Sequence, residues 1–143
     1  MTRIARSALV NYSASQMFDL VNDIENYPRF MQGCVSARVL ERGDDYLLGE
    51  LTLAKAGLRQ TFTTRNTLVP GESMSMSLVK GAFRSFSATW RFAPLAADAC
   101  KVSLEMEFEF SSGLMDFAME KLFSASANSL VDALVKRAQQ VYG

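Results

Sequence analysis

The sequence predicts an α+β fold in which a curved antiparallel sheet wraps around one long C-terminal helix. Turn signals recur about every ten residues through the middle of the chain, which is typical of consecutive antiparallel strands. Apolar and polar residues then alternate strictly over 100–110, and the apolar period becomes three to four residues from Gly113 onward. A one-sided sheet must cover its apolar face, and a long amphipathic helix is the obvious cover.

The N-terminal third predicts a strand followed by two short helices. The strand is expected over Arg3–Asn11. Ser13 or Ser15 is expected to cap a helix that runs through Val21, because a serine oxygen accepts from the free backbone N–H groups of a first turn. Asp23 is expected to cap a second helix over Ile24–Tyr27, ended by Pro28 because the residue before a proline avoids the α region.

Six further strands and one long helix are expected. Pro94–Asp98 should form the turn between the last two strands. Ser111 and Ser112 should supply capping oxygens for a helix over Gly113–Val141, whose apolar stripe includes Met115 and Val141. Small residues within that stripe leave room for a cavity against the sheet. The expected strands are Val35–Arg42, Tyr46–Lys55, Leu58–Val69, Ser73–Val79, Phe83–Phe92 and Cys100–Phe110.

Composition restricts the classes of function. The 143 residues fit one domain spanning 1–143, and 15 basic residues balance 15 acidic ones, which argues against DNA binding through overall charge. The chain has no histidine, so the usual zinc sites, histidine-based nucleophile pairs and the commonest general base are absent. We therefore expect a protein that is not an enzyme and that holds no metal or catalytic cofactor.

The expected location is the cytoplasm. Cys34 and Cys100 have no CxxC spacing, which suits free thiols in a reducing compartment. No apolar run reaches the ~20 residues needed to span a bilayer, and the first residues carry no signal-peptide core. Transient contact with the inner membrane face is left open, since a lipid ligand would have to be loaded from somewhere.

Four motifs resemble one family. VNDIENYPRF (21–30), AKAGLRQTFTTR (54–65), GAFR (81–84) followed by WRF (90–92), and VKRAQQVYG (135–143) resemble, in order, motifs of the coenzyme-Q-binding START-domain family. The wording of the second motif is most similar to the bacterial branch known as ribosome association toxin A. Two departures stand out: the family's FLPWC reads FMQGC at 30–34, and GPF reads GAF.

The resemblance implies the helix-grip fold and two non-catalytic roles. Eukaryotic members imply binding of ubiquinone between sheet and helix, linked to respiration. The bacterial branch implies binding to the large ribosomal subunit, which blocks its association with the small one. A polyketide-cyclase type of enzyme is a third alternative on the same fold, with Asp23 and Glu25 as its nearest carboxylate pair; helix capping explains Asp23 more simply.

Candidate binding residues follow from these patterns. Tyr27 and Phe30 would form a lid over a cavity, or simply a packed turn. Arg59 and Arg65 lie on one strand face that should point outward, and they are the candidates for contact with the ribosome or a polar head group; a solvated sheet face is the alternative. The remaining candidates would line an apolar ligand cavity, or form a dry core: Phe62, Trp90, Phe92, Met106, Phe108, Phe110, Met119 and Phe123.

Overall fold

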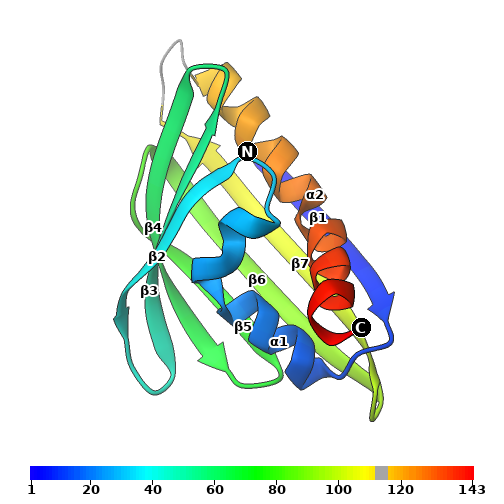
Figure 1. Ribbon diagram of the computed structural model, residues 1–143. Coiled ribbons are helices and arrows are strands. Elements are labelled where there is room, and N and C mark those ends of the chain that lie inside the picture. The colour runs from blue at the N-terminus through cyan, green and yellow to red at the C-terminus, as the bar shows by residue number, and fades with distance from the viewer. Residues whose placement is uncertain (112–115) are drawn as a thin grey trace.

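A curved seven-stranded antiparallel sheet holds the long helix α2 against its concave face (Figure 1). The computed structural model describes residues 1–111 and 116–143. Strand order across the sheet is β1-β7-β6-β5-β4-β3-β2, so the first strand pairs with the last. The elements are β1 (Thr2–Val10), α1 (Ala14–Asn22), the 3-10 helix η1 (Ile24–Arg29), β2 (Cys34–Arg42), β3 (Tyr46–Lys55), β4 (Leu58–Val69), β5 (Ser73–Lys80), β6 (Phe83–Ala96), β7 (Ala99–Phe110) and α2 (Asp116–Tyr142). The predicted helix-grip architecture is confirmed.

Helix α1 begins at Ser13, not at Ser15. The Ser13 hydroxyl accepts from the Gln16 backbone N–H at 3.1 Å, and the Gln16 side chain accepts from the Ser13 backbone N–H at 2.9 Å. This reciprocal pair is a capping box, which satisfies two otherwise free donors. Ser15 is exposed inside the first turn. The expected apolar face of α1, Met17, Phe18, Leu20 and Val21, is buried.

The second short helix differs from the prediction in type and length. It is a 3-10 helix that continues through Pro28 to Arg29. Proline does not stop it because the bonds that close it skip the missing Pro28 N–H: Phe30 N and Met31 N both donate to the Tyr27 carbonyl. Asp23 makes no side-chain cap; its carboxylate accepts instead from the Asn26 side chain at 2.5 Å.

Strand β6 is longer than expected. The turn predicted over Pro94–Asp98 is shorter, because the strand continues to Ala96. Pro94 lies opposite Cys100, and the register shifts between Pro94 and Ala96. A strand residue without an N–H is tolerated at such an irregularity, where the ladder is already interrupted.

Helix α2 buries the expected stripe only as far as Ala138. Residues 139–143 are all exposed, so the prediction that Val141 belongs to the buried face is wrong. In the last turn it is Tyr142 that contacts the rest of the fold, through a hydrogen bond from its hydroxyl to the Gln16 carbonyl of α1. Ser112, Gly113 and Met115, for which a cap, a helix start and a core position were expected, lie outside the described residues.

An aromatic cluster closes one end of the space between sheet and helix. The Phe123 ring on α2 lies 4.6 Å from the ring of Phe108 and 5.2 Å from that of Phe83, both on the sheet. Edge-to-face contacts of this kind stabilise by about 0.5–1.5 kcal/mol each beyond the burial of apolar area. Phe62, Phe86 and Phe110 complete the cluster.

Candidate functional site

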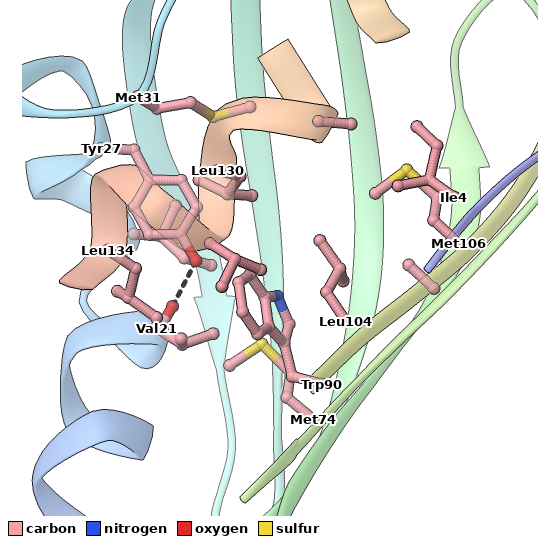
Figure 2. Close-up of a cluster of buried hydrophobic side chains, with 14 of the residues drawn as sticks. Ile4, Val21, Tyr27, Met31, Met74, Trp90, Leu104, Met106, Leu130 and Leu134 are labelled. Atoms are coloured by element: carbon pink, nitrogen blue, oxygen red, sulfur yellow. Dashed lines mark hydrogen bonds between the residues drawn. The ribbon is translucent and has the colours of Figure 1, made fainter. Parts of the chain in front are cut away.

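A small internal cavity lies between the sheet, η1 and α2. Figure 2 shows Tyr27 and Met31 near η1, Leu130 on α2, and Trp90 and Met106 on the sheet gathered in this region. The cavity has a volume of about 40 Å³. Its wall consists of Ile24, Tyr27, Met31, Gly49, Leu51, Phe62, Thr64, Asn66, Met76, Phe86, Trp90, Met106, Phe123, Ala127 and Leu130.

The cavity is small in this structure. Its volume of about 40 Å³ exceeds the ~10–15 Å³ that one water molecule requires. Pockets that hold drug-sized ligands have ~300–1,000 Å³. Met31, Met76 and Met106 belong to the wall, and unbranched thioether side chains can change rotamer with little loss of packing. A larger molecule would therefore enter by moving these side chains.

The otherwise apolar wall contains one hydrogen-bonded pair. The Thr64 hydroxyl donates to Asn66 Oδ1 at 2.7 Å, and Asn66 Nδ2 donates to the Met74 sulfur at 3.7 Å. Thr64 is 5% exposed and Asn66 1% exposed. Burying an amide is unfavourable unless it is hydrogen-bonded, so this pair is a candidate for contact with a polar group of a ligand.

The phenol of Tyr27 joins η1 to α1. Its hydroxyl donates to the backbone carbonyl of Val21 at 2.5 Å, one of the carbonyls that a helix end leaves without a partner. Burial, followed by the charges of Cys34 and Asp23, raises the pKa of Tyr27 well above its usual range. The phenol is therefore a neutral donor occupied by Val21, not an acid or base near neutral pH.

The structure places five predicted cavity residues in the wall. These are Tyr27, Phe62, Trp90, Met106 and Phe123. They come from η1, β4, β6, β7 and α2, so the fold brings together residues up to 96 positions apart, from 27 to 123. Their role as ligand contacts stays a prediction.

The other predicted cavity residues lie elsewhere. Phe30 is half-buried outside the cavity, with its ring 5.3 Å from that of Tyr27. Phe92 packs under α1, 5.9 Å from the Phe18 ring. Phe108 and Phe110 belong to the aromatic cluster around Phe123, and Met119 is buried on α2 without reaching the wall.

Sequence reasoning missed the polar wall residues. Asn66 and Thr64 occupy the same inward face of β4 as Phe62 and Leu68. The signal was present, because a strand that alternates apolar and polar residues should not place an asparagine on its apolar face. Gly49 was missed because glycine carries no apolar signal of its own, whereas Ala127 is one of the small residues in the helix stripe that were expected to leave room for a cavity.

Arg59 and Arg65 lie on the outer face of β4 and are exposed, as predicted. The Arg65 guanidinium lies 4.1 Å from the centroid of the Tyr46 ring, a cation–π contact. Acidic side chains share this face: Glu50 pairs with Arg38 at 2.9 Å, and Glu41 accepts from the Tyr46 hydroxyl. The face is therefore mixed in charge.

A second surface is more uniformly cationic. A groove between η1 and α2 is lined by Arg29, Lys136 and Arg137, with Asp132 as its acidic residue. The Arg137 guanidinium lies 6.0 Å from the centroid of the Phe30 ring. None of these three cations forms a salt bridge with another described residue. The remaining lining residues, Phe30, Gln32, Ser129, Ala133 and Gln140, are neutral; we call this surface the η1–α2 groove.

Groups suited to catalysis are lacking in the cavity wall. Asp23 and Glu25 are exposed and outside it, and the described wall contains no carboxylate. Cys34 and Cys100 are buried free thiols whose pKa values are raised by burial, which disfavours the nucleophilic thiolate. Within residues 1–111 and 116–143, no group of three His, Cys, Asp or Glu side chains is placed to bind a metal. No described helix is long and apolar enough to cross a membrane.

Comparison with known proteins gives consistent sequence matches. A family model described as "Polyketide cyclase / dehydrase and lipid transport" matches residues 10–135. The Ribosome association toxin RatA of Vibrio cholerae is 47% identical over all of this chain and 99% of its own length. The Coenzyme Q-binding protein COQ10 homolog B, mitochondrial, of Xenopus laevis is 25% identical over 97% of this chain and 59% of its own length.

Among solved structures, the Zhui aromatase/cyclase from Streptomyces is similar with a TM-score of 0.86. The match covers 99% of this chain and 96% of that one at 16% identity. A likeness at this level of identity concerns the fold alone.

Proposed function

Because this chain belongs to the polyketide cyclase/dehydrase and lipid transport family, we propose that it is a non-catalytic binding protein that holds an apolar, oxygen-bearing ring of the quinone class between its sheet and α2. The observation that carries this proposal is the buried cavity, whose apolar wall contains a single hydrogen-bonded polar pair. Isoprenoid quinones combine a ring bearing carbonyl oxygens with an apolar tail, which suits such a wall.

The absence of reactive groups from the described wall supports binding without chemistry. The phenol of Tyr27 is occupied by a backbone carbonyl, and Thr64 and Asn66 do not titrate near neutral pH. The name of the Xenopus relative, a coenzyme Q-binding protein, is consistent with a quinone as the ligand. Ubiquinone is the specific ligand we propose.

Binding requires the cavity to widen. Its volume of about 40 Å³ is far below the ~300 Å³ at the lower end of ligand pockets, so the ring must displace side chains. The methionines of the wall and the short helix η1, which carries Tyr27, are the parts best suited to move, because a short 3-10 helix is held by few backbone bonds.

Native mass spectrometry of protein purified from cells tests this function. We expect a fraction of the 15.8 kDa chain to carry an additional mass that matches a respiratory quinone, and organic extraction to release the same compound. A chain that is free of ligand and takes up no added ubiquinone would contradict the proposal.

Ribosome association is the second candidate function. It is favoured by the name of the Vibrio relative, Ribosome association toxin RatA, at 47% identity over the whole chain. The η1–α2 groove adds a physical basis, because clustered guanidinium and ammonium groups beside an aromatic ring suit RNA phosphates and bases. The two functions use different parts of the molecule and are compatible.

Sucrose-gradient profiles test the second candidate and locate its surface. Added protein should comigrate with the large ribosomal subunit in a salt-sensitive manner. If the η1–α2 groove is the surface, Arg29→Glu with Arg137→Glu should abolish comigration, whereas loss with Arg59→Glu and Arg65→Glu would favour the outer face of β4. Arg84→Glu with Lys101→Glu, both exposed elsewhere, is the matched control. Unchanged profiles with the wild-type chain would argue against any ribosome role.

A further inference from the structure

We propose that the side-chain amide of Asn66, oriented by Thr64, donates the hydrogen bond that holds a carbonyl oxygen of the bound ligand inside the cavity. This assignment rests on the proposed ligand-binding function and names the chemical group that the site selects. The ligand class is a neutral ring that carries an acceptor oxygen.

Position within the sheet makes Asn66 part of the cavity. It lies on β4, opposite Leu47 of β3 and Met76 of β5, so strands flank it on both sides. Its side chain points inward with that of Thr64, and both belong to the wall. With 1% exposure, the amide cannot exchange its hydrogen bonds freely with bulk water.

The neighbouring groups determine which way the amide faces. A thioether sulfur accepts hydrogen bonds and cannot donate them, so the amide atom near the Met74 sulfur must be Nδ2. Oδ1 is then the atom that accepts from the Thr64 hydroxyl at 2.7 Å. Thr64 therefore fixes the oxygen of the amide, and the nitrogen is the end that donates hydrogen bonds.

The Nδ2 group has more donors than partners. It carries two N–H bonds, and its one acceptor among the described residues is the Met74 sulfur at 3.7 Å, a weak one. One N–H of this buried amide thus has no acceptor among the described residues, which is unfavourable unless a water or ligand oxygen accepts from it. A leucine of similar size would avoid this cost, so the amide indicates a polar occupant.

The other polar groups narrow the ligand class. The Tyr27 hydroxyl already donates to Val21, and the Thr64 hydrogen is directed to Asn66, so neither is a free donor in this structure. The indole N–H of Trp90 is a second donor in the wall, and like the Asn66 amide it calls for an acceptor oxygen on the ligand. No cation or carboxylate lies in the described wall, so a charged ligand would be buried without a partner. A neutral carbonyl oxygen on an apolar ring accepts a hydrogen bond and carries no charge, so it suits this wall.

Two tetramethylated six-membered rings, one with carbonyl oxygens and one without, test the assignment. Duroquinone carries two ring carbonyls, and durene has C–H groups in their place. Duroquinone has no unsubstituted ring carbon for a thiol to add to, and durene is an unreactive hydrocarbon. Trp90, the only tryptophan, lies in the wall and reports occupancy through its fluorescence. We expect the wild-type chain to bind duroquinone about tenfold more tightly than durene, as one hydrogen bond would produce.

The decisive variant is Asn66→Leu. It should lower duroquinone affinity about tenfold and leave durene affinity unchanged, because only the hydrogen bond is lost. Thr52→Val is the matched control. Thr52 is also buried and forms a hydrogen bond with Thr61 at 2.8 Å, but it lies outside the cavity wall. The Thr52→Val chain should therefore bind both compounds as the wild type does. If Asn66→Leu fails to fold, Thr64→Val, which frees the amide to rotate, should give a smaller loss in the same direction.

The outcomes separate this inference from the proposed function. Wild-type-like affinity of the folded Asn66→Leu chain for duroquinone would overturn the role of the amide while leaving a quinone site in place. Failure of the wild-type chain to bind either ring compound would overturn the ligand-binding function and the amide assignment together.

Discussion

At the scale of single residues, Tyr27 shows how one hydroxyl can join two elements. The phenol satisfies the Val21 carbonyl at the end of α1 from a position on η1, at 2.5 Å. Its ring is also part of the cavity wall. Tyr27, which the sequence analysis expected to cover a cavity, therefore also stabilises the fold through its hydroxyl. The sequence pattern alone does not show whether such a hydroxyl is buried or faces solvent.

Tyr27→Phe should lower stability by about 1–3 kcal/mol, because a buried carbonyl loses its partner. Urea unfolding at neutral pH measures the change. Tyr142→Phe is the matched control, since its hydroxyl also donates to an α1 carbonyl, that of Gln16, but at an exposed position. The control should change stability by less than about 0.5 kcal/mol. Equal effects of the two variants would contradict the structural role of Tyr27.

The pH dependence of unfolding isolates the same group. The pKa of Tyr27 is raised in the folded chain, so its contribution is present below the unfolded value of about 10 and is lost as the pH rises above it. Tyr27→Phe lacks this group, so its stability should fall less steeply above about pH 10 than that of the wild type. Parallel profiles for the two chains would show that the phenol does not titrate with folding.

At the scale of elements, the helix starts show what pattern alone leaves open. Both Ser13 and Ser15 are good caps by residue type, and only the backbone path decides between them. Ser13 has extended φ and ψ angles and faces the Gln16 N–H, whereas Ser15 is already inside the helix. The effects of Pro28 and Pro94 on their elements are likewise decided by the backbone path. A proline lacks an N–H, and this is unfavourable only where the structure offers a carbonyl that the N–H would have bonded.

Ser13→Ala should destabilise the chain by about 1 kcal/mol, because the first turn of α1 loses its cap. Ser15→Ala, two residues along and exposed, should change stability by less than about 0.5 kcal/mol. Thermal or urea unfolding of the two variants side by side is the measurement. A larger loss of stability from Ser15→Ala than from Ser13→Ala would contradict the assignment of Ser13 as the cap of α1.

At the scale of the whole molecule, the cavity wall combines small residues from both layers of the fold. Gly49 on β3 and Ala127 on α2 both belong to the wall. Ala127 is 1% exposed, so any side chain added there must extend into the cavity or push the layers apart. The cavity is thus a property of sheet and helix together.

Ala127→Val should reduce quinone uptake, because two added methyl groups occupy a space of about 40 Å³. Stability should change by less than about 1.5 kcal/mol if the methyl groups fill the cavity rather than strain the core. Ribosome comigration, tested in parallel, should be unaffected because the η1–α2 groove lies on the surface. Unchanged quinone binding by a folded Ala127→Val chain would show that the ligand binds elsewhere.

The sequence by itself determined the sheet, the helix that covers it and the order of the elements, because periods of two and of three to four residues follow directly from strand and helix geometry. It also determined that Phe62, Trp90 and Phe123 are inside. Only the tertiary structure decided which inward side chains meet around one space. Phe92, Phe108 and Phe110 share the inward pattern with Trp90 and Met106 yet pack into a dry core, because curvature and the path of α2 bring only part of the sheet face to the cavity. Asn66 became a candidate anchor for the same reason: its neighbours Thr64 and Met74, and the space beside them, are defined by strand register and helix position, which no local pattern contains.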